Sequence, residues 1–270
     1  MTQRYKTKQP DKNKALTSEI NKLARKYKRY GYRMITAKLR QNGWTVNHKR
    51  IQRIWQKEGL QVPYRHKFRK AKGTSDNSCA VKKAEYINHV WTYDFMTDQT
   101  EDGVKLKILT VLDEFTRESL AIEPGRSIRA RDVIAVLEYL FLVRGAPKFI
   151  RSDNGPEFIA DAIEKWLNIN QVETLHIAPG SPWENGYIES FNGKLRDEVL
   201  DREVFYSVKE AKVIVESWRL EYNNHRPHSS LDYMTPAAFA ASRNPPGSAT
   251  LRLADCGIKN VDTPLIEVGT

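Results

Sequence analysis

The chain has 270 residues, of which 40% are hydrophobic and 29% charged, so it has enough apolar material for a packed core and is not wholly disordered. No stretch approaches the roughly 20 apolar residues of a membrane span, and the N-terminus lacks the apolar segment of a signal peptide. The two cysteines, Cys79 and Cys256, cannot form a disulfide framework or a four-ligand zinc site. These features favour a reducing, cytosolic setting and no membrane partner.

The net charge of +11 is distributed unevenly along the chain. Residues 1–83 carry 24 basic and 4 acidic side chains, whereas residues 84–270 carry 20 basic and 29 acidic ones. Such an asymmetry indicates that the first third contacts a polyanion, most often nucleic acid. A solvated basic tail or an RNA- or ribosome-binding arm has the same charge pattern, so charge alone leaves these alternatives open.

Three short helical patterns follow one another in the basic part. The first begins at a cap formed by Thr17 or Ser18, the second spans Tyr32–Gln41, and the third, capped by Asn47, spans His48–Glu58. The third helix has an apolar side and a basic side, formed by Ile51, Ile54 and Trp55 and by Arg50, Arg53 and Lys57 respectively. This arrangement predicts a DNA-binding helix-turn-helix. The alternative is an ordinary three-helix bundle with a solvated basic face.

From residue 89 the sequence predicts a mixed sheet with flanking helices, an α/β fold. Three successive strands are followed by a helix over Arg129–Arg144, a strand, a helix over Pro156–Asn168 and a fifth strand. Two more helices are expected over Pro182–Leu200 and Val208–Tyr222. The expected units are a small all-α helix-turn-helix domain (1–60), a basic linker (61–84), the α/β core with C-terminal helices (85–242) and an extended tail (243–270).

Three acidic residues are candidates for catalysis. Asp94 lies within the first strand, where an acid is unfavourable unless something compensates for it. Asp153 follows the fourth strand at a sharp turn, and Glu189 lies on the helix expected over Pro182–Leu200. Acids on a strand, a strand end and a helix can converge on Mg²⁺, and two such ions can promote an in-line phosphoryl displacement. Each acid taken alone is equally compatible with a capping or ion-pairing role.

The segments around these acids favour the catalytic role over capping or ion pairing. The segments WTYDF, SDNGPEF, SPWENGYIESFNGKLRDE and EYNNHRPHSSLDYMTPAAF closely resemble the integrase-core family with its DDE acid triad and ribonuclease-H-like fold. The resemblance is closest to OrfB-type transposases of the insertion sequence three family. The segment YGYRMITAKLRQNGWTVNHKRIQRIWQKEGL resembles the helix-turn-helix that precedes that core, so the match covers residues 26–239.

This resemblance implies roles for individual residues. Asp94, Asp153 and Glu189 match the metal-binding catalytic acids, with Mg²⁺ or Mn²⁺, two ions per site, as the implied cofactor. Asn185 and Arg196 share the helical face of Glu189 and are expected to contact DNA, with Lys194 as an offset alternative to Arg196. The segment from His225 to His228 is typical of the family, but its sequence does not indicate a chemical role.

The resemblance also implies an activity and partners. The expected activity is cleavage of transposon ends in double-stranded DNA, followed by strand transfer to target DNA. A metal-dependent nuclease that does not join DNA, and a non-catalytic DNA-binding regulator, are the alternatives. The expected partners are a homo-oligomer during synapsis and the product of an upstream reading frame, OrfA. No zinc is expected, because His48, His66 and Cys79 lack ligand spacing.

Overall fold

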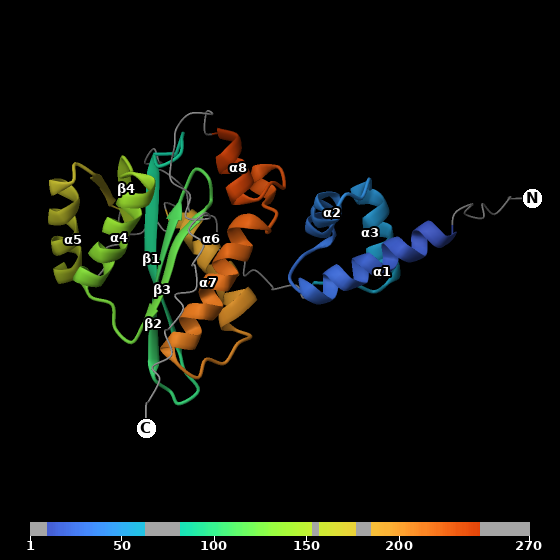
Figure 1. Ribbon diagram of the computed structural model, residues 1–270, viewed down its shortest axis with the longest axis horizontal. Coiled ribbons are helices and arrows are strands. Elements are labelled where there is room, and N and C mark those ends of the chain that lie inside the picture. Colours follow the sequence, from blue (N-terminus) through green and yellow to red (C-terminus); the bar gives the residue numbers. More distant parts are fainter. Residues whose placement is uncertain (1–9, 63–81, 153–156, 177–184, 244–270) are drawn as a thin grey trace, which may run out of the picture.

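The computed structural model describes residues 10–62, 82–152, 157–176 and 185–243. In these segments three N-terminal helices lie beside a larger part, in which helices cover both faces of a five-stranded sheet (Figure 1). None of the described helices is long and apolar enough to cross a membrane.

The N-terminal part consists of α1 (Pro10–Lys26), α2 (Tyr32–Gln41) and α3 (His48–Lys57) around an apolar core of their own. The Asn47 side chain accepts a hydrogen bond from the Lys49 amide over 2.9 Å and caps α3 as expected. The first helix starts at Pro10, well before the cap expected at Thr17 or Ser18. Its apolar stripe extends a turn upstream, because Leu16 is buried in the same core.

The sheet has the strand order β3-β2-β1-β4-β5. Its strands are β1 (Val90–Gln99), β2 (Lys105–Asp113), β3 (Ser119–Gly125), β4 (Phe149–Ser152) and β5 (Glu173–His176). Strands β1, β2 and β3 form an antiparallel meander, whereas β4 pairs in parallel with both β1 and β5. The mixed sheet expected from the sequence is therefore confirmed, with β1 at its centre.

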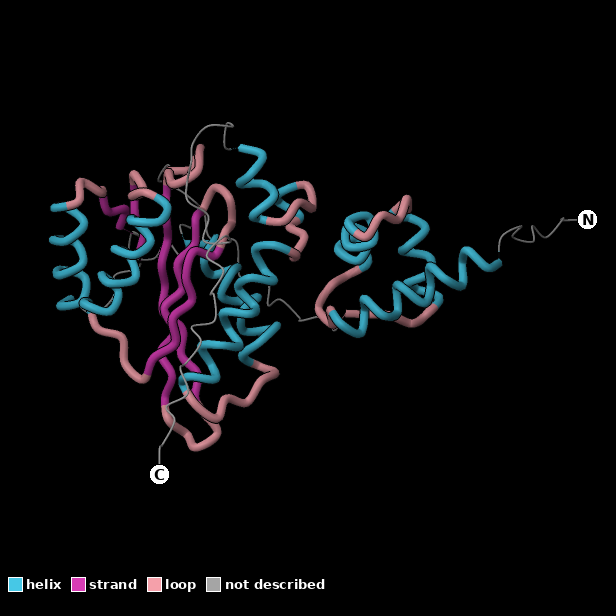
Figure 2. Tube along the Cα trace, viewed as in Figure 1, coloured by secondary structure: helices cyan, strands magenta, loops and turns pink. Residues whose placement is uncertain are grey.

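Neighbouring residues of β2 supply opposite cores, because successive side chains of a strand point to opposite faces. Leu109 packs with α4 (Ala130–Arg144) and α5 (Glu157–Ile169) on one face. Ile108 packs on the other face with the helices α6 (Gly186–Leu195), η2 (Arg196–Leu200) and α7 (Val208–Asn224). The chain continues through η3 (Ser229–Leu231) into α8 (Pro236–Arg243). Figure 2 shows the sheet between these two helical layers.

The helix expected over Pro182–Leu200 is not uniform. Residues 182–184 lie outside the described segments, α6 ends at Leu195, and η2 continues the chain as a π-helical turn. Val199 and Leu200, at the end of this π-helical turn, are both buried in the core.

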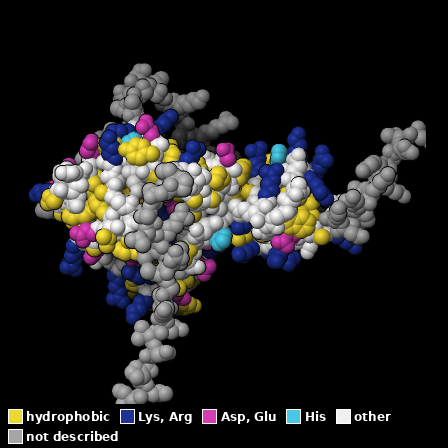
Figure 3. Space-filling view, turned by 45° about the horizontal axis from the view of Figure 1, so that its top comes forward, with side chains coloured by type: hydrophobic (Ala, Val, Ile, Leu, Met, Phe, Trp, Pro, Cys, Tyr) yellow, Lys and Arg dark blue, Asp and Glu magenta, His cyan; other side chains and the backbone are white. Residues whose placement is uncertain are grey.

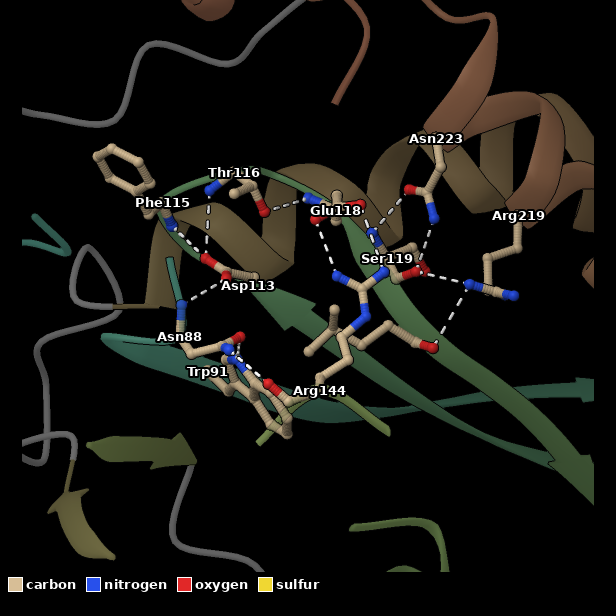
Figure 4. A network of polar contacts seen from close by, with 11 residues as sticks. Asn88, Trp91, Asp113, Phe115, Thr116, Glu118, Ser119, Arg144, Arg219 and Asn223 are labelled. Carbon is tan, nitrogen blue, oxygen red and sulfur yellow. Dashed lines mark hydrogen bonds and ion pairs between the residues drawn. The ribbon is translucent and has the colours of Figure 1, made fainter. Parts of the chain in front are cut away.

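A network of hydrogen bonds surrounds the β2–β3 turn, at the end of the sheet where β1 begins (Figure 4). The buried Asp113 carboxylate accepts hydrogen bonds from the backbone amides of Asn88, Phe115 and Thr116 at 3.0, 2.7 and 3.2 Å. The Asn223 side chain of α7 bonds the backbone amide and carbonyl of Ser119 at 2.9 and 2.8 Å. The network therefore joins the β2–β3 turn to both the start of β1 and α7.

Candidate active site

Asp94 lies in the middle of the central strand β1, opposite Thr110 of β2. Its carboxylate accepts hydrogen bonds from the side-chain amide of Asn192 and from the backbone amide of Phe95, both at 2.7 Å. Asn192 lies on α6, and its amide oxygen accepts a hydrogen bond from the Thr110 hydroxyl over 3.0 Å. These contacts compensate for an acid in the strand, and they orient its carboxylate toward α6.

Helix α6 runs alongside β1 in the same direction. The Thr92 hydroxyl donates a hydrogen bond to the side-chain oxygen of Asn185 over 3.1 Å, at the start of α6. The guanidinium of Arg196, just beyond its end, donates to the Thr97 carbonyl over 3.1 Å. The helix from Asn185 to Arg196 and the strand from Thr92 to Thr97 each span about 16 Å, so the two elements remain in step along this length.

Glu189 lies on the side of α6 that carries these contacts. It follows Asn185 by four residues and precedes Asn192 by three, spacings that bring side chains to one side of a helix. Its side chain is exposed, whereas both asparagines are buried. Asp94 and Glu189 therefore stand on the same face of the sheet, one on β1 and the other on the helix packed against it.

The third predicted acid, Asp153, lies outside the described residues. Strand β4, which ends at Ser152, is parallel to β1 and pairs Arg151 with Thr92. No group of three or more His, Cys, Asp or Glu side chains within the described segments is placed to hold a metal ion. The structure thus brings Asp94 and Glu189 to one face and leaves the complete triad a prediction.

The donors at this site suit a hard divalent cation. Both acids supply carboxylate oxygens, the ligand type that Mg²⁺ and Mn²⁺ prefer. The hydrogen bonds to Asp94 from Asn192 and Phe95 come from neutral groups, so they orient the carboxylate without neutralising it. The exposure of Glu189 leaves its oxygens accessible. The residues present therefore fit the metal that the sequence implies.

The three residues near Glu189 that were predicted to contact DNA differ in placement. Asn185 is buried and bonded to Thr92, and Arg196 is partly exposed with a bond to Thr97. Lys194 lies about 140° around the helix from Glu189, and its ammonium bonds the carbonyl and hydroxyl of Ser190 at 2.8 and 2.7 Å. Burial lowers the pKa of Lys194 to about 8. Contact with DNA stays a prediction for all three.

The basic face predicted for the third helix is present on α3. Arg50, Arg53 and Lys57 are exposed, whereas Ile51 and Trp55 on the opposite side are buried. The Arg50 guanidinium bonds the Asn13 side chain of α1 over 2.6 Å. Lys and Arg side chains crowd the surface of the N-terminal helices (Figure 3). This surface has the charge that a phosphate backbone requires.

Two residues for which the sequence indicated no role occupy central positions. Asn192 holds Asp94, and its only signal was its place in the SFNGK stretch, three residues after Glu189. Arg226, in the segment whose role the sequence did not indicate, is buried and bonds Glu198 of η2 over 2.7 Å.

Comparison with family models divides the chain into two kinds of segment. Residues 85–182 and 170–236 each match an integrase core domain. Residues 10–68 match an HTH-like domain, which includes α1, α2 and α3. The matches thus cover both parts of the structure.

Similar proteins are encoded by insertion elements. The chain is 38% identical over 237 residues to an uncharacterized 31.7 kDa protein of insertion element IS407 from Burkholderia multivorans, covering 88% of this chain and 84% of the relative. It is 25% identical over 243 residues to the putative transposase InsK of IS150 from Escherichia coli, covering 85% and 84%.

The fold has a counterpart among solved structures. A chain of the simian T-cell lymphotropic virus intasome, solved in complex with a PP2A regulatory subunit, aligns with a TM-score of 0.52 and 14% sequence identity. The alignment covers 91% of this chain and 80% of the viral one. At this identity the likeness concerns the fold alone, and it agrees with the ribonuclease-H-like core expected from the sequence.

Proposed function

Because this chain belongs to the integrase-core transposase family of insertion elements, we propose that it is a DNA strand transferase. Water first cleaves a phosphodiester at a transposon end and releases a 3′-OH. That 3′-OH then attacks the phosphorus of a target-DNA phosphodiester. The new bond joins the transposon end to the target strand, and the bond from that phosphorus to the 3′ oxygen of the adjacent target nucleotide breaks, which frees a 3′-OH on the target. Asp94, Asp153 and Glu189 are the catalytic acids of both steps.

The three acids act by holding divalent cations, Mg²⁺ or Mn²⁺. When bound, two such ions stabilise the attacking and leaving oxygens of an in-line displacement. Asn192 fixes the Asp94 carboxylate through its 2.7 Å hydrogen bond. Asn185, bonded to Thr92, anchors the start of the helix on which Glu189 is carried.

The observation that carries this proposal is the pairing of α6 with β1. Asn185 and Asn192, which flank Glu189 in the sequence, contact Thr92 and Asp94 of β1, and these contacts support a role for Glu189 beside Asp94. The sheet register supports the third acid. Strand β4 is parallel to β1 and pairs Arg151 with Thr92, and it ends at Ser152, directly before Asp153 in the sequence.

DNA is held by the basic N-terminal part and by the flank of α6. We assign the major-groove contacts to Arg50, Arg53 and Lys57 of α3, and contacts near the cleaved phosphate to Arg196. Pairing of two transposon ends calls for at least two copies of the chain, with the OrfA product as a further partner. The enzyme acts in the cytosol, where the element's DNA lies.

One experiment separates this proposal from its two rivals. Labelled duplexes copied from the DNA that flanks the gene are incubated with the protein and Mg²⁺, together with an unlabelled target duplex. A strand transferase yields both a shortened strand and longer joined products. A nuclease yields the shortened strand alone, and a non-catalytic regulator binds the duplex without changing it. Omission of the metal abolishes both products if the acids act as proposed.

A further inference from the structure

The N-terminal helices dock on the C-terminal part of the core. The hydroxyl of Tyr27, the residue that follows α1, donates a hydrogen bond to the Glu221 carboxylate of α7 over 2.9 Å. The Lys38 ammonium of α2 donates to the His225 carbonyl over 3.1 Å, and Lys38 is buried although it belongs to a basic helix. Burial disfavours the charged form of Lys38 and lowers its pKa. The hydrogen bond to the His225 carbonyl partly offsets this loss of hydration. The N-terminal unit therefore has a defined position beside α7 (Figure 1). Its docking surface, the seat, is formed by Tyr27, Lys38, Glu221 and His225.

Arg226 lies at the centre of this seat. Its guanidinium binds both carboxylate oxygens of Glu198, with the shortest contact at 2.7 Å, and only 7% of the residue is exposed. It also lies over the rings of Tyr30, from the N-terminal unit, and Tyr222, from α7, at 5.4 and 5.8 Å. A planar guanidinium can bond a carboxylate and stack on aromatic rings at once, which an ammonium cannot do.

Two routes lead from Arg226 to α6. Glu198 belongs to η2, which continues α6 directly, and its carboxylate also accepts a hydrogen bond from the Trp218 indole over 3.2 Å. Tyr222 packs edge-on against Phe191 of α6 with ring centroids 5.0 Å apart. Phe191 lies two residues after Glu189. Both routes end on the helix that carries the proposed catalytic acid.

We propose that Arg226 is a positioning residue that latches the N-terminal helices to η2 and thereby holds α6, with Glu189, against β1. The DNA-binding unit and the acid helix then move as one body. This gives a role to Arg226, which lies in the segment from His225 to His228. The consequence for catalysis rests on the proposed function of Glu189, whereas the latch itself does not.

The latch is tested in the full-length chain by hydrogen exchange of the α6 amides, which needs neither DNA nor activity. Arg226→Gln removes the charge and the bidentate contact, and Arg226→Lys restores the charge. Tyr27→Phe perturbs the seat more gently by deleting the bond to Glu221. Arg219→Gln is the matched control, because Arg219 is a partly buried α7 residue that bonds Glu216 at 2.6 Å and faces β3 instead of the N-terminal helices.

We expect exchange of the α6 amides to rise about tenfold in Arg226→Gln, a change of about 1.4 kcal/mol in local opening, and to recover in part in Arg226→Lys. Small-angle scattering should show a larger radius of gyration for Arg226→Gln. Tyr27→Phe should shift exchange in the same direction by a smaller factor. The control should leave exchange within about twofold of wild type. Unchanged α6 exchange in both Arg226→Gln and Tyr27→Phe would overturn the latch.

Activity supplies the second readout. At saturating DNA, the single-turnover cleavage rate of Arg226→Gln should fall about tenfold, while its Kd for a short duplex stays within about twofold of wild type. If the substitution merely unfolded part of the protein, fewer molecules would be active, but the cleavage rate of the folded molecules would stay at the wild-type value. Faster α6 exchange with an unchanged rate would refute the link to catalysis. A wild-type protein that does not cleave DNA refutes the proposed function, while the exchange data still decide the latch.

Discussion

The Asn192 side chain donates a hydrogen bond to the Asp94 carboxylate over 2.7 Å and accepts one from the Thr110 hydroxyl over 3.0 Å. One amide thus ties α6 to both β1 and β2 at the position of the central acid. A charged residue in the middle of a sheet is tolerated here because its partner comes from the covering helix. The same bond fixes the direction in which the carboxylate points, which is what a metal-holding group needs.

Asn192→Asp should damage this site while hardly changing its shape. The substitution replaces the donor by a second carboxylate facing Asp94, and the two charges repel one another. We expect the free energy of unfolding at pH 7 to fall by about 1–3 kcal/mol. The loss should be smaller at pH 5, because one carboxyl of the pair then binds a proton. Denaturant unfolding at both pH values measures this, with the exposed Asn168→Asp as control. Wild-type stability at pH 7 would argue against the orienting role of Asn192.

Asp113 should make stability fall as pH rises through the acid range. Burial raises the pKa of Asp113 to about 6, against the opposing effect of three backbone hydrogen bonds. Between the unfolded pKa near 4 and this folded value, the folded state binds a proton that the unfolded state has lost. This group therefore stabilises the fold fully below about pH 4, and its contribution of up to about 3 kcal/mol is lost by about pH 6.

The variant Asp113→Asn isolates this effect, because it lacks the titrating group while other carboxyls titrate as before. From pH 4 to pH 6, the unfolding free energy of wild type should fall relative to that of the variant by an amount of order 1–3 kcal/mol. Above about pH 6 the difference should stay constant. A difference that is independent of pH over this range would show that Asp113 titrates normally.

The basic face of α3 should bind DNA mainly through phosphates. Arg53→Ala and Lys57→Ala should each weaken binding and lower the magnitude of the slope of log K against log salt by about 0.9. The control is Lys209→Ala, an exposed lysine at the start of α7. Fluorescence anisotropy with one duplex at several salt concentrations gives both values. An unchanged slope in the α3 variants would show that this face does not contact the DNA phosphates.

Local sequence patterns were sufficient for most of the fold. Strand alternation and helical stripes are set by neighbouring residues, so the five strands and the capped third helix were predicted, and the helix expected over Arg129–Arg144 is present as α4. Details that depend on packing were not. The early start of α1 depends on burial of Leu16, and the π-helical turn after α6 depends on the core around Val199.

The candidate site was predicted less completely for the same reason. Asp94 and Glu189 stand out because an acid in a strand and a long family-like motif are visible in sequence. The partner of Asp94 lies 98 residues away, and Tyr27 meets Glu221 across 194 residues. Such pairings follow from the tertiary fold, so no local signal identified Asn192 or the docking role of Arg226. Lys38 belongs to the basic N-terminal part, yet it is buried and bonded to the His225 carbonyl after α7.

The most direct test of the proposed chemistry compares Glu189→Gln with Glu138→Gln. Both replace an exposed glutamate on a helix by its neutral analogue, but Glu138 lies on α4, on the other face of the sheet. Single-turnover cleavage and joining in Mg²⁺ are measured at saturating DNA, alongside the Kd. We expect Glu189→Gln to lose roughly a hundredfold or more in rate with unchanged or slightly tighter DNA binding, and Glu138→Gln to match wild type. Full activity in Glu189→Gln would remove Glu189 from the active site and contradict the strand-transferase assignment.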